Sequence, residues 1–164
     1  MQLIPLTQGL FAQVDDWNYD RLMEHKWYAN KIRGNFYAKR NIVLPTGKRT
    51  SLFIHREIMN TPEGLECDHI NHDTLNCLEE NMRNCTPHQN MLNKKPWGKS
   101  QYLGVSSYYK NGTKGQRYLY FTSYITINRK TITLGNFKDE VLAAKARDTA
   151  AIKYFGEFAN LNFK

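Results

Sequence analysis

A short stretch in the middle of the chain gathers side chains that could hydrolyse a phosphodiester bond. Asp68 and His69 are adjacent, Asn81 lies twelve positions after His69, and Asn90 lies nine further on. Such hydrolysis needs a base that deprotonates water and a cation that stabilises charge on the phosphoryl and leaving oxygens. An unperturbed imidazole has a pKa of about 6.5 and is mostly neutral at pH 7. His69 is therefore the candidate general base.

Oxygen donors accompany this histidine. Asp68 and Asn90 offer a carboxylate and an amide oxygen, which favour Mg²⁺ or Mn²⁺ over zinc. Asn81 could hold the intervening loop and orient His69 by hydrogen bonding. Neighbouring strand residues point to opposite faces, so Asp68 and His69 can serve one phosphate only where their strand ends or distorts. The sequence predicts Asp68 and Asn90 as metal ligands, and His69, Asn81 and Asn90 as catalytic residues.

These residue types and spacings resemble the HNH nucleases over roughly residues 51–93. The resemblance implies a ββα-metal (His-Me finger) core. It assigns the general base to His69, the metal ligands to Asp68 and Asn90, and the structural middle position to Asn81. One catalytic site in one chain implies that each active site nicks one DNA strand.

The likeness extends to the start of the chain and to His55–Met59, which resemble phage homing-type HNH proteins. This implies a site-directed homing endonuclease, encoded by a phage and acting in the cytoplasm of a bacterial host. One loop departs from the family: residues 75–78 read Leu-Asn-Cys-Leu where Leu-Asp-Asn-Arg is frequent. The departure leaves a second interpretation open, a non-catalytic DNA-binding regulator with a decayed HNH fold.

The charge of the chain points to a polyanionic partner. The formal net charge is +8; residues 91–134 hold eight basic residues and no acidic one, and residues 31–56 are also free of acids. Such patches favour nucleic acid, and we expect double-stranded DNA, with an RNA-binding or RNA-cutting protein as a weaker alternative. No obligate protein partner is evident. The expected DNA contacts are Arg56, Lys94, Lys95, Lys99, Lys110, Arg117, Thr122, Tyr124, Thr126, Arg129 and Lys130.

The last third of the chain predicts a three-stranded antiparallel sheet with one helix packed on it. Strands are expected over residues 103–109, 118–127 and 130–134, and an alanine-rich helix over 140–155, capped by Asp139. In the middle strand, alternate residues should face the helix. These are Phe121, Ser123, Ile125 and Ile127. The other set, Thr122, Tyr124 and Thr126, would then face outward, where hydroxyls and rings fit a DNA groove.

Residues 100–163 also resemble the plant ethylene-response-factor (Apetala-type) DNA-binding domain. The matching parts are Tyr102–Val105, Phe121-x-Ser123-x-Ile125, Leu134–Phe137, Ala143-Ala144 with Asp148, and Ala159–Phe163. The resemblance implies docking on duplex DNA. Phe121 stands where the family has tryptophan, and Ser106, Ser107 and Tyr108 stand where it has arginines, so no target sequence is implied.

The fold class expected for the whole chain is α+β. Residues 1–93 would form a small α+β platform and the nuclease domain, with its core at 51–93; residues 94–99 would be a linker, and 100–164 the docking domain. In the platform, Asp15-Asp16 can cap a short helix that runs to about His25, with Trp17, Leu22 and Met23 available for its inner face. In the core, a strand over 65–70 should be followed by a helical or turn segment over 78–83. A helix over 87–93, capped by Thr86, should complete it.

Composition excludes several other classes. The three cysteines form no Cys-x-x-Cys pair, which argues against a disulfide framework or a four-cysteine zinc site. No signal peptide and no apolar run long enough to span a bilayer is visible. We therefore expect a cytoplasmic protein with reduced thiols and no membrane partner.

Overall fold

The computed structural model describes residues 1–163. The chain divides into two compact units, Met1–Asn90 and Met91–Lys164, and each unit is described by itself. Both are built from small sheets and few helices, so the protein is of mixed α+β class.

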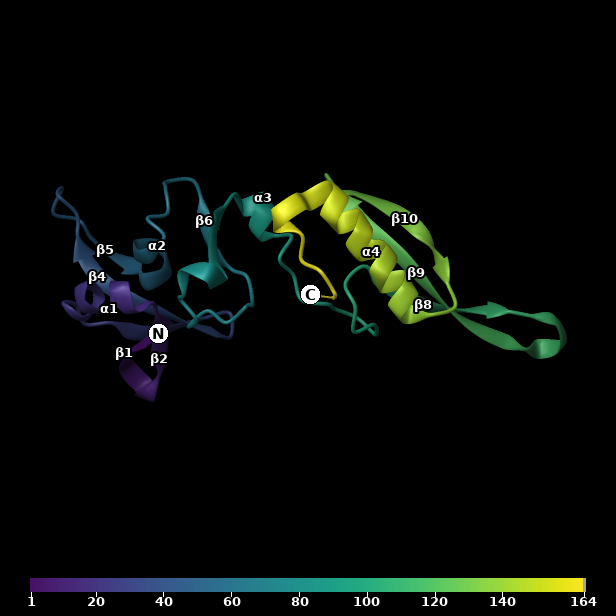
Figure 1. Ribbon diagram of the computed structural model, residues 1–164, viewed down its shortest axis with the longest axis horizontal. Coiled ribbons are helices and arrows are strands. Elements are labelled where there is room, and N and C mark those ends of the chain that lie inside the picture. Colours follow the sequence, from purple (N-terminus) through teal and green to yellow (C-terminus); the bar gives the residue numbers. More distant parts are fainter. Residues whose placement is uncertain (164) are drawn as a thin grey trace. The chain divides into compact units, whose positions relative to one another are not determined.

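The first unit begins with the platform. Its elements are β1 Gln2–Pro5, β2 Phe11–Val14, α1 Asp16–Met23, β3 Tyr28–Ile32, β4 Asn35–Val43, β5 Arg49–Phe53 and α2 Ile54–Ile58. Strands β1 and β2 form an antiparallel hairpin, and β3, β4 and β5 form a separate antiparallel sheet in that order (Figure 1). A short turn at Thr7–Gly9 joins β1 to β2, where a hairpin turn was expected.

The core of this unit is the hydrophobic cluster around Ile4, Val14, Leu22 and Ile54, which are all fully buried. The expectation for α1 was right for Leu22 and wrong for Trp17 and Met23, which are 70% and 42% exposed. Residues four apart share one face of a helix, and Leu22 shares its face with buried Asn18. The buried face of α1 is therefore narrower than predicted, since of the three predicted residues it contains only Leu22.

The remainder of the unit is a hairpin followed by a short helix. Its elements are β6 Glu66–His69, η2 Glu79–Asn81, β7 Met82–Cys85 and α3 Pro87–Asn90. Strand β7 was not expected: the helical turn ends at Asn81, and residues 82–85 pair antiparallel with β6. Helix α3 stops at Asn90 rather than Asn93. Thr86 caps it as expected, since Gln89 N donates to Thr86 Oγ1 at 3.2 Å and Gln89 Oε1 accepts from Thr86 N at 2.8 Å.

The second unit is the expected sheet with one helix. Its elements are β8 Val105–Asn111, β9 Arg117–Ile127, β10 Lys130–Phe137 and α4 Glu140–Phe155, with single turns η3 Thr113–Gly115 and η4 Gly156–Phe158. The antiparallel sheet has the order β10-β9-β8, and α4 lies along it (Figure 1). Asp139 caps α4, since its Oδ1 accepts from Leu142 N at 2.9 Å.

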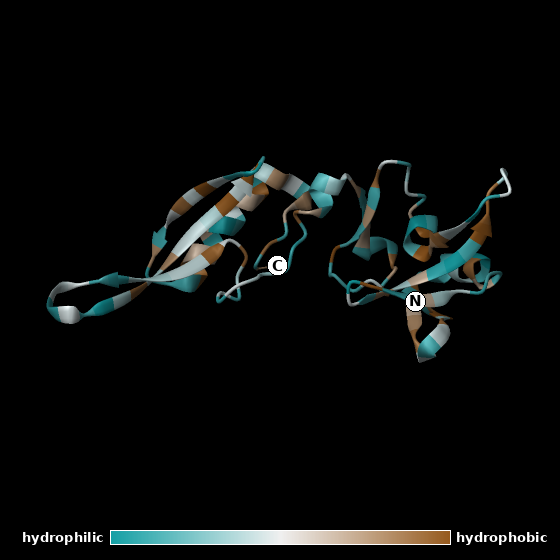
Figure 2. Cartoon of the chain, turned by 180° about the vertical axis from the view of Figure 1, so that it is seen from behind, coloured by the Kyte–Doolittle hydropathy of each residue, from teal (hydrophilic) through white to brown (hydrophobic). Residues whose placement is uncertain are grey.

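The alternation expected along β9 is confirmed. Ser123 and Ile125 are buried, whereas Thr126 is exposed. Ala143 and Ala144 are fully buried against Val105 and its neighbours, and Ala151 packs with Ile125. Small side chains let the helix approach the sheet closely. Figure 2 shows hydrophobic (brown) and hydrophilic (teal) residues interspersed along the strands of this unit.

Among residues 1–163, no helix is both long and apolar enough to cross a membrane.

Candidate active site and nucleic-acid interface

Asp68 and His69 are the last two residues of β6. In the hairpin, Asp68 pairs with Arg83 and His69 with Met82. Both side chains are buried, at 6% and 5% exposure. They turn to different neighbours, as adjacent strand residues do: the carboxylate of Asp68 meets Arg83, and the ring of His69 meets other aromatic rings.

The surroundings of His69 keep it neutral. Its ring packs edge-on against His55, with centroids 5.0 Å apart, and against Tyr37 at 6.3 Å. Burial lowers the pKa of His69 to about 4, against the opposing effect of Asp68 and Asp73. The imidazole is therefore neutral at pH 7, which is the protonation state that a general base requires, although a pKa of about 4 makes it a weaker base than an exposed imidazole.

His55 is a second buried histidine beside the first. It stacks on Phe53 with centroids 5.2 Å apart, and its Nδ1 is buried without a hydrogen-bond partner among residues 1–163. Burial, and next the nearby His69, lower the pKa of His55 to about 3. Its ring thus serves as uncharged packing around His69.

Arg56 was expected to contact DNA. Its guanidinium instead donates to two backbone carbonyls, from Nη1 to Leu65 O at 3.0 Å and from Nη2 to Pro62 O at 3.3 Å. These bonds hold the turn that leads into β6. The structure gives Arg56 a structural task, and DNA contact by this residue stays a prediction.

The carboxylate of Asp68 is paired with an arginine. Arg83 Nε and Nη2 donate to Asp68 Oδ2 at 3.0 Å and 2.9 Å. Both side chains are largely buried, and these charge-assisted hydrogen bonds are stronger than bonds between neutral groups. One carboxylate oxygen therefore carries a guanidinium at the position where a metal ligand is predicted.

Asn90 reaches the same hairpin from α3. Its Nδ2 donates to Glu66 Oε2 at 2.6 Å. Glu66 and Asp68 are two apart on β6 and so share one face of the strand. This brings Asn90 to the side of the hairpin that carries Asp68.

The donor chemistry of this face fits a hard divalent cation. Asp68 and Asn90 supply a carboxylate and an amide oxygen, the ligands that Mg²⁺ prefers, and Mg²⁺ keeps several waters beside one or two such groups. Among residues 1–163, no group of three or more His, Cys, Asp or Glu side chains could hold a metal by itself. Metal binding by Asp68 and Asn90 stays a prediction.

Asn81 ties both ends of the loop that follows β6. Its Oδ1 accepts from Asn71 N at 3.1 Å, and its Nδ2 donates to Asn76 O at 2.8 Å. Its own carbonyl accepts from Ile70 N at 2.8 Å. The side chain therefore closes the 70–76 loop directly behind His69.

The platform anchors the same loop from outside. Gln13 N donates to Leu75 O at 2.8 Å, and Gln13 O accepts from Cys77 N at 2.9 Å. Thr74 Oγ1 donates to Phe36 O at 2.6 Å. A loop that departs from the family sequence is thus held by backbone pairing with β2 and by a bond to β4. The platform therefore acts as a scaffold for this loop.

Three neighbours of the predicted site were missed from the sequence: Arg83, Glu66 and Cys77. Reading residues 82–85 as a strand would have found Arg83, because the hairpin register then places it opposite Asp68. Cys77 is fully buried in the core of the unit, with its Sγ 3.9 Å from His69 Nε2. No sequence signal distinguishes this thiol from an ordinary core cysteine.

The predicted DNA contacts of the second unit fall into separate groups. Lys110 and Arg117 lie on the β8–β9 hairpin, where Arg117 stacks 4.7 Å from the ring of Tyr109. Arg129 and Lys130 lie at the β9–β10 turn, and Lys95 and Lys99 are exposed before the sheet. Lys94, Tyr124 and Thr126 come together around one pocket. Thr122 bonds its neighbour Asn136 at 2.8 Å.

Comparison with known proteins gives one informative likeness. The chain is 29% identical over 163 residues to a protein of Acanthamoeba polyphaga mimivirus named as an uncharacterized HNH endonuclease, covering 98% of this chain and 79% of the relative. No family model matches the chain. The likeness supports the HNH family and spans both units.

Proposed function

We propose that this protein is a metal-dependent HNH-type endonuclease that cuts double-stranded DNA. The observation that carries the proposal is the hairpin of β6 and β7. It holds a neutral, buried His69 at the end of a strand, with Asn81 closing the loop behind it and Asn90 joined to the same strand. The mimivirus relative named as an HNH endonuclease supports this class of activity.

In the proposed reaction, His69 accepts a proton from the water that attacks the phosphorus. Asn81 keeps the loop and the ring in place. Asp68 and Asn90 hold Mg²⁺ or Mn²⁺, which when bound supplies positive charge to the phosphoryl and leaving oxygens. One such site per chain would nick one strand. We further propose a homing-type role for a phage or virus, exercised in the cytoplasm of its host.

The second unit would dock the enzyme on its substrate. Its sheet with one packed helix is the arrangement that the likeness to the ethylene-response-factor domain implies, and its cations stand at both ends of β9. Replacing Arg129 and Lys130 together with Gln should weaken duplex binding. It should also lower the slope of log affinity against log salt by about 1 for each phosphate that the variant no longer neutralises.

The deciding experiment compares two histidine variants on plasmid DNA with Mg²⁺. We expect His69→Ala to lower the nicking rate by roughly 10²–10⁴-fold while gel-shift affinity stays nearly unchanged. His88→Ala is the matched control, since His88 is exposed on α3, and it should cut normally. Equal cutting by the two variants would exclude His69 as the base.

A second candidate is a DNA-binding regulator without catalysis. The pairing of Arg83 with Asp68 favours it, because a guanidinium at this carboxylate competes with a cation. If the wild-type chain binds duplex DNA but never nicks it with Mg²⁺ or Mn²⁺, the regulator is the correct function.

A further inference from the structure

The second unit contains a small pocket with two cations pointing into it. Its volume is about 160 Å³, and its lining includes Lys94, Trp97, Tyr124, Thr126 and Arg147. Whole drug-sized ligands occupy pockets of about 300–1,000 Å³. This pocket therefore suits a small group rather than a complete cofactor.

Arg147 is the built-in cation of the pocket. It is only 7% exposed, and it reaches the pocket from α4. Its Nη1 donates to Asp148 Oδ1 at 3.2 Å and to the carbonyl of Asn160. Its Nε and Nη2 meet no acceptor among residues 1–163. A buried guanidinium with donors to spare is suited to an oxygen-rich anion.

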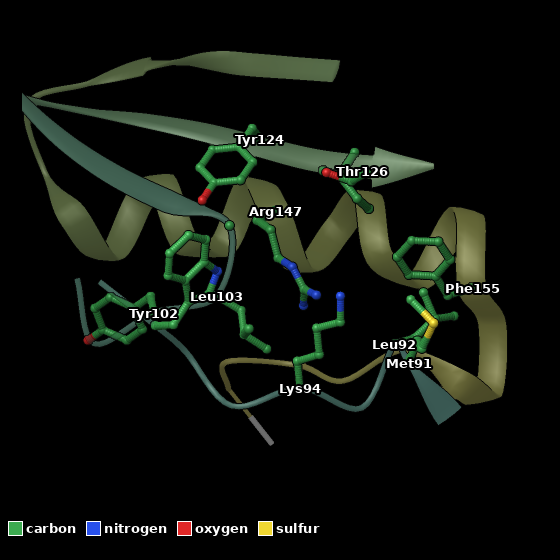
Figure 3. Close-up of a pocket in the computed structure, with 12 residues that line it drawn as sticks. Met91, Leu92, Lys94, Tyr102, Leu103, Tyr124, Thr126, Arg147 and Phe155 are labelled. Atoms are coloured by element: carbon green, nitrogen blue, oxygen red, sulfur yellow. The ribbon is translucent and has the colours of Figure 1, made fainter. Parts of the chain in front are cut away.

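Lys94 supplies the second charge. Figure 3 shows its ammonium and the Arg147 guanidinium pointing toward one another. Asn160 contacts both residues, because its carbonyl accepts from Arg147 and its Nδ2 donates to the backbone carbonyl of Lys94 at 2.6 Å. Lys94 is exposed, so its ammonium can turn into solvent, whereas an anion between the two cations would attract both.

The nearest acid, Asp148, forms an ion pair with Arg147 and so offsets part of the charge of the pocket. Asp148 does not line the pocket, and besides Arg147 it accepts from Asn162 N at 2.8 Å, Asn162 Nδ2 at 3.0 Å and Phe163 N at 3.0 Å. Lys94, Arg147 and Asp148 together carry a net charge of +1. The pocket is therefore left attractive to an anion.

We propose that this pocket binds a phosphate group of a nucleic-acid strand. The lining also offers the hydroxyl of Thr126, which can donate to a phosphate oxygen, and the rings of Trp97 and Tyr124, on which a base can stack. The inference extends the docking role proposed for this unit. Phosphate binding itself requires neither cleavage nor that role.

The test uses the full chain and inorganic phosphate, with dimethyl phosphate as a model of the backbone diester, at constant ionic strength. Binding is followed by NMR at the Nε–H of Arg147 and the indole N–H of Trp97. Both signals should shift and saturate. Lys94→Gln should weaken binding about tenfold, as loss of one charge-assisted hydrogen bond does. Lys95→Gln is the control, because Lys95 is exposed and does not line the pocket.

Two results with the wild-type chain and the lysine variants would overturn the proposal. One is that neither phosphate shifts the Arg147 signal; the other is that Lys94→Gln and Lys95→Gln weaken binding equally. The source of the phosphate is decided by competition. Inorganic phosphate should weaken duplex binding by the wild-type chain, and about tenfold more phosphate should be needed for the same effect on Lys94→Gln. If phosphate binds but does not weaken duplex binding, the pocket does not bind a phosphate of a nucleic-acid strand.

The phosphate titration uses no DNA. A negative result there would therefore contradict the phosphate pocket and leave the nuclease proposal untouched. Arg147→Met provides a second variant, and its fold is checked by whether the remaining amide signals of β9 keep their positions. A folded Arg147→Met that still binds phosphate as the wild type does also overturns the site.

Discussion

The thiol of Cys77 lies 3.9 Å from Nε2 of the predicted base, His69. Cys77 also points its Sγ toward Thr74 O at the same distance. Burial raises the pKa of this thiol far above its usual range, so it stays protonated. An uncharged thiol therefore lies beside Nε2 of His69 and adds no charge next to the ring.

Cys77→Ala tests whether Cys77 positions the ring of His69 in addition to stabilising the fold. We expect a stability loss of about 1 kcal/mol, and a nicking rate reduced by up to about 10²-fold as the ring loses its neighbour. Cys85→Ala is the control, since Cys85 is equally buried but its Sγ faces Glu66 O. Chemical denaturation and plasmid nicking at saturating DNA measure the two effects. Equal nicking by both variants would show that Cys77 only fills space.

Arg83→Met should reveal whether a cation can replace the guanidinium at Asp68. Breaking a buried pair leaves a carboxylate uncompensated, and we expect a loss of about 3 kcal/mol. Mg²⁺ should then raise the melting temperature of the variant more than that of the wild type, because binding to the folded state stabilises it.

The control for this variant is Arg40→Met. Arg40 and Glu57 form a pair of the same 2.9 Å separation, also largely buried, away from the hairpin. Arg40→Met should lose stability without gaining a response to Mg²⁺. An equal Mg²⁺ response in both variants would argue against a cation site at Asp68.

The two buried histidines should make the first unit sensitive to acid. In the folded chain the pKa of His55 is about 3 and that of His69 about 4, below the ordinary value near 6.5. Between about pH 4 and pH 6.5 the unfolded chain therefore binds more protons, so stability rises with pH and is lost as pH falls through this window.

His55→Phe should weaken this dependence. Phenylalanine can keep the stack on Phe53 and takes up no proton, so proton uptake on unfolding near pH 5 should fall from about two to about one. Urea denaturation across the pH range gives the slope. A slope unaffected by His55→Phe would mean that His55 is not the buried neutral group described above.

Gly104→Ala should destabilise the second unit strongly. Gly104 has φ +67°, and a Cβ there would lie 2.7 Å from Arg147 Cγ and against the carbonyl of Tyr124. Gly115→Ala is the control, because Gly115 has φ +74° and open space around it. The control should cost about 1 kcal/mol of backbone strain. Gly104→Ala should cost clearly more, measured by hydrogen exchange of β9 amides; equal costs would contradict the close approach.

Local pattern was sufficient for much of the second unit. Helix α4 begins and ends where its cap Asp139 and the following Gly156 predict, because caps and periodicity are properties of neighbouring residues. Strand β7 was missed for the opposite reason. Its four residues show no clear alternation, and they become a strand only by pairing with β6 across a twelve-residue connection. The prediction that Trp17 lies on the inner face of α1 was wrong for a similar reason. Its Nε1 donates at 2.9 Å to the exposed carboxylate of Glu79, a residue distant in sequence.

For the candidate site, the sequence by itself determined which groups could do chemistry: Asp68, His69, Asn81 and Asn90, at spacings that resemble one nuclease family. Only the tertiary structure decided their states and neighbours. It buried His69 until its pKa fell to about 4, placed Arg83 on Asp68, and brought Lys94 to Arg147 across the second unit. The physical reason is that burial and charge pairing depend on what surrounds a side chain, and those surroundings come from residues far away along the chain.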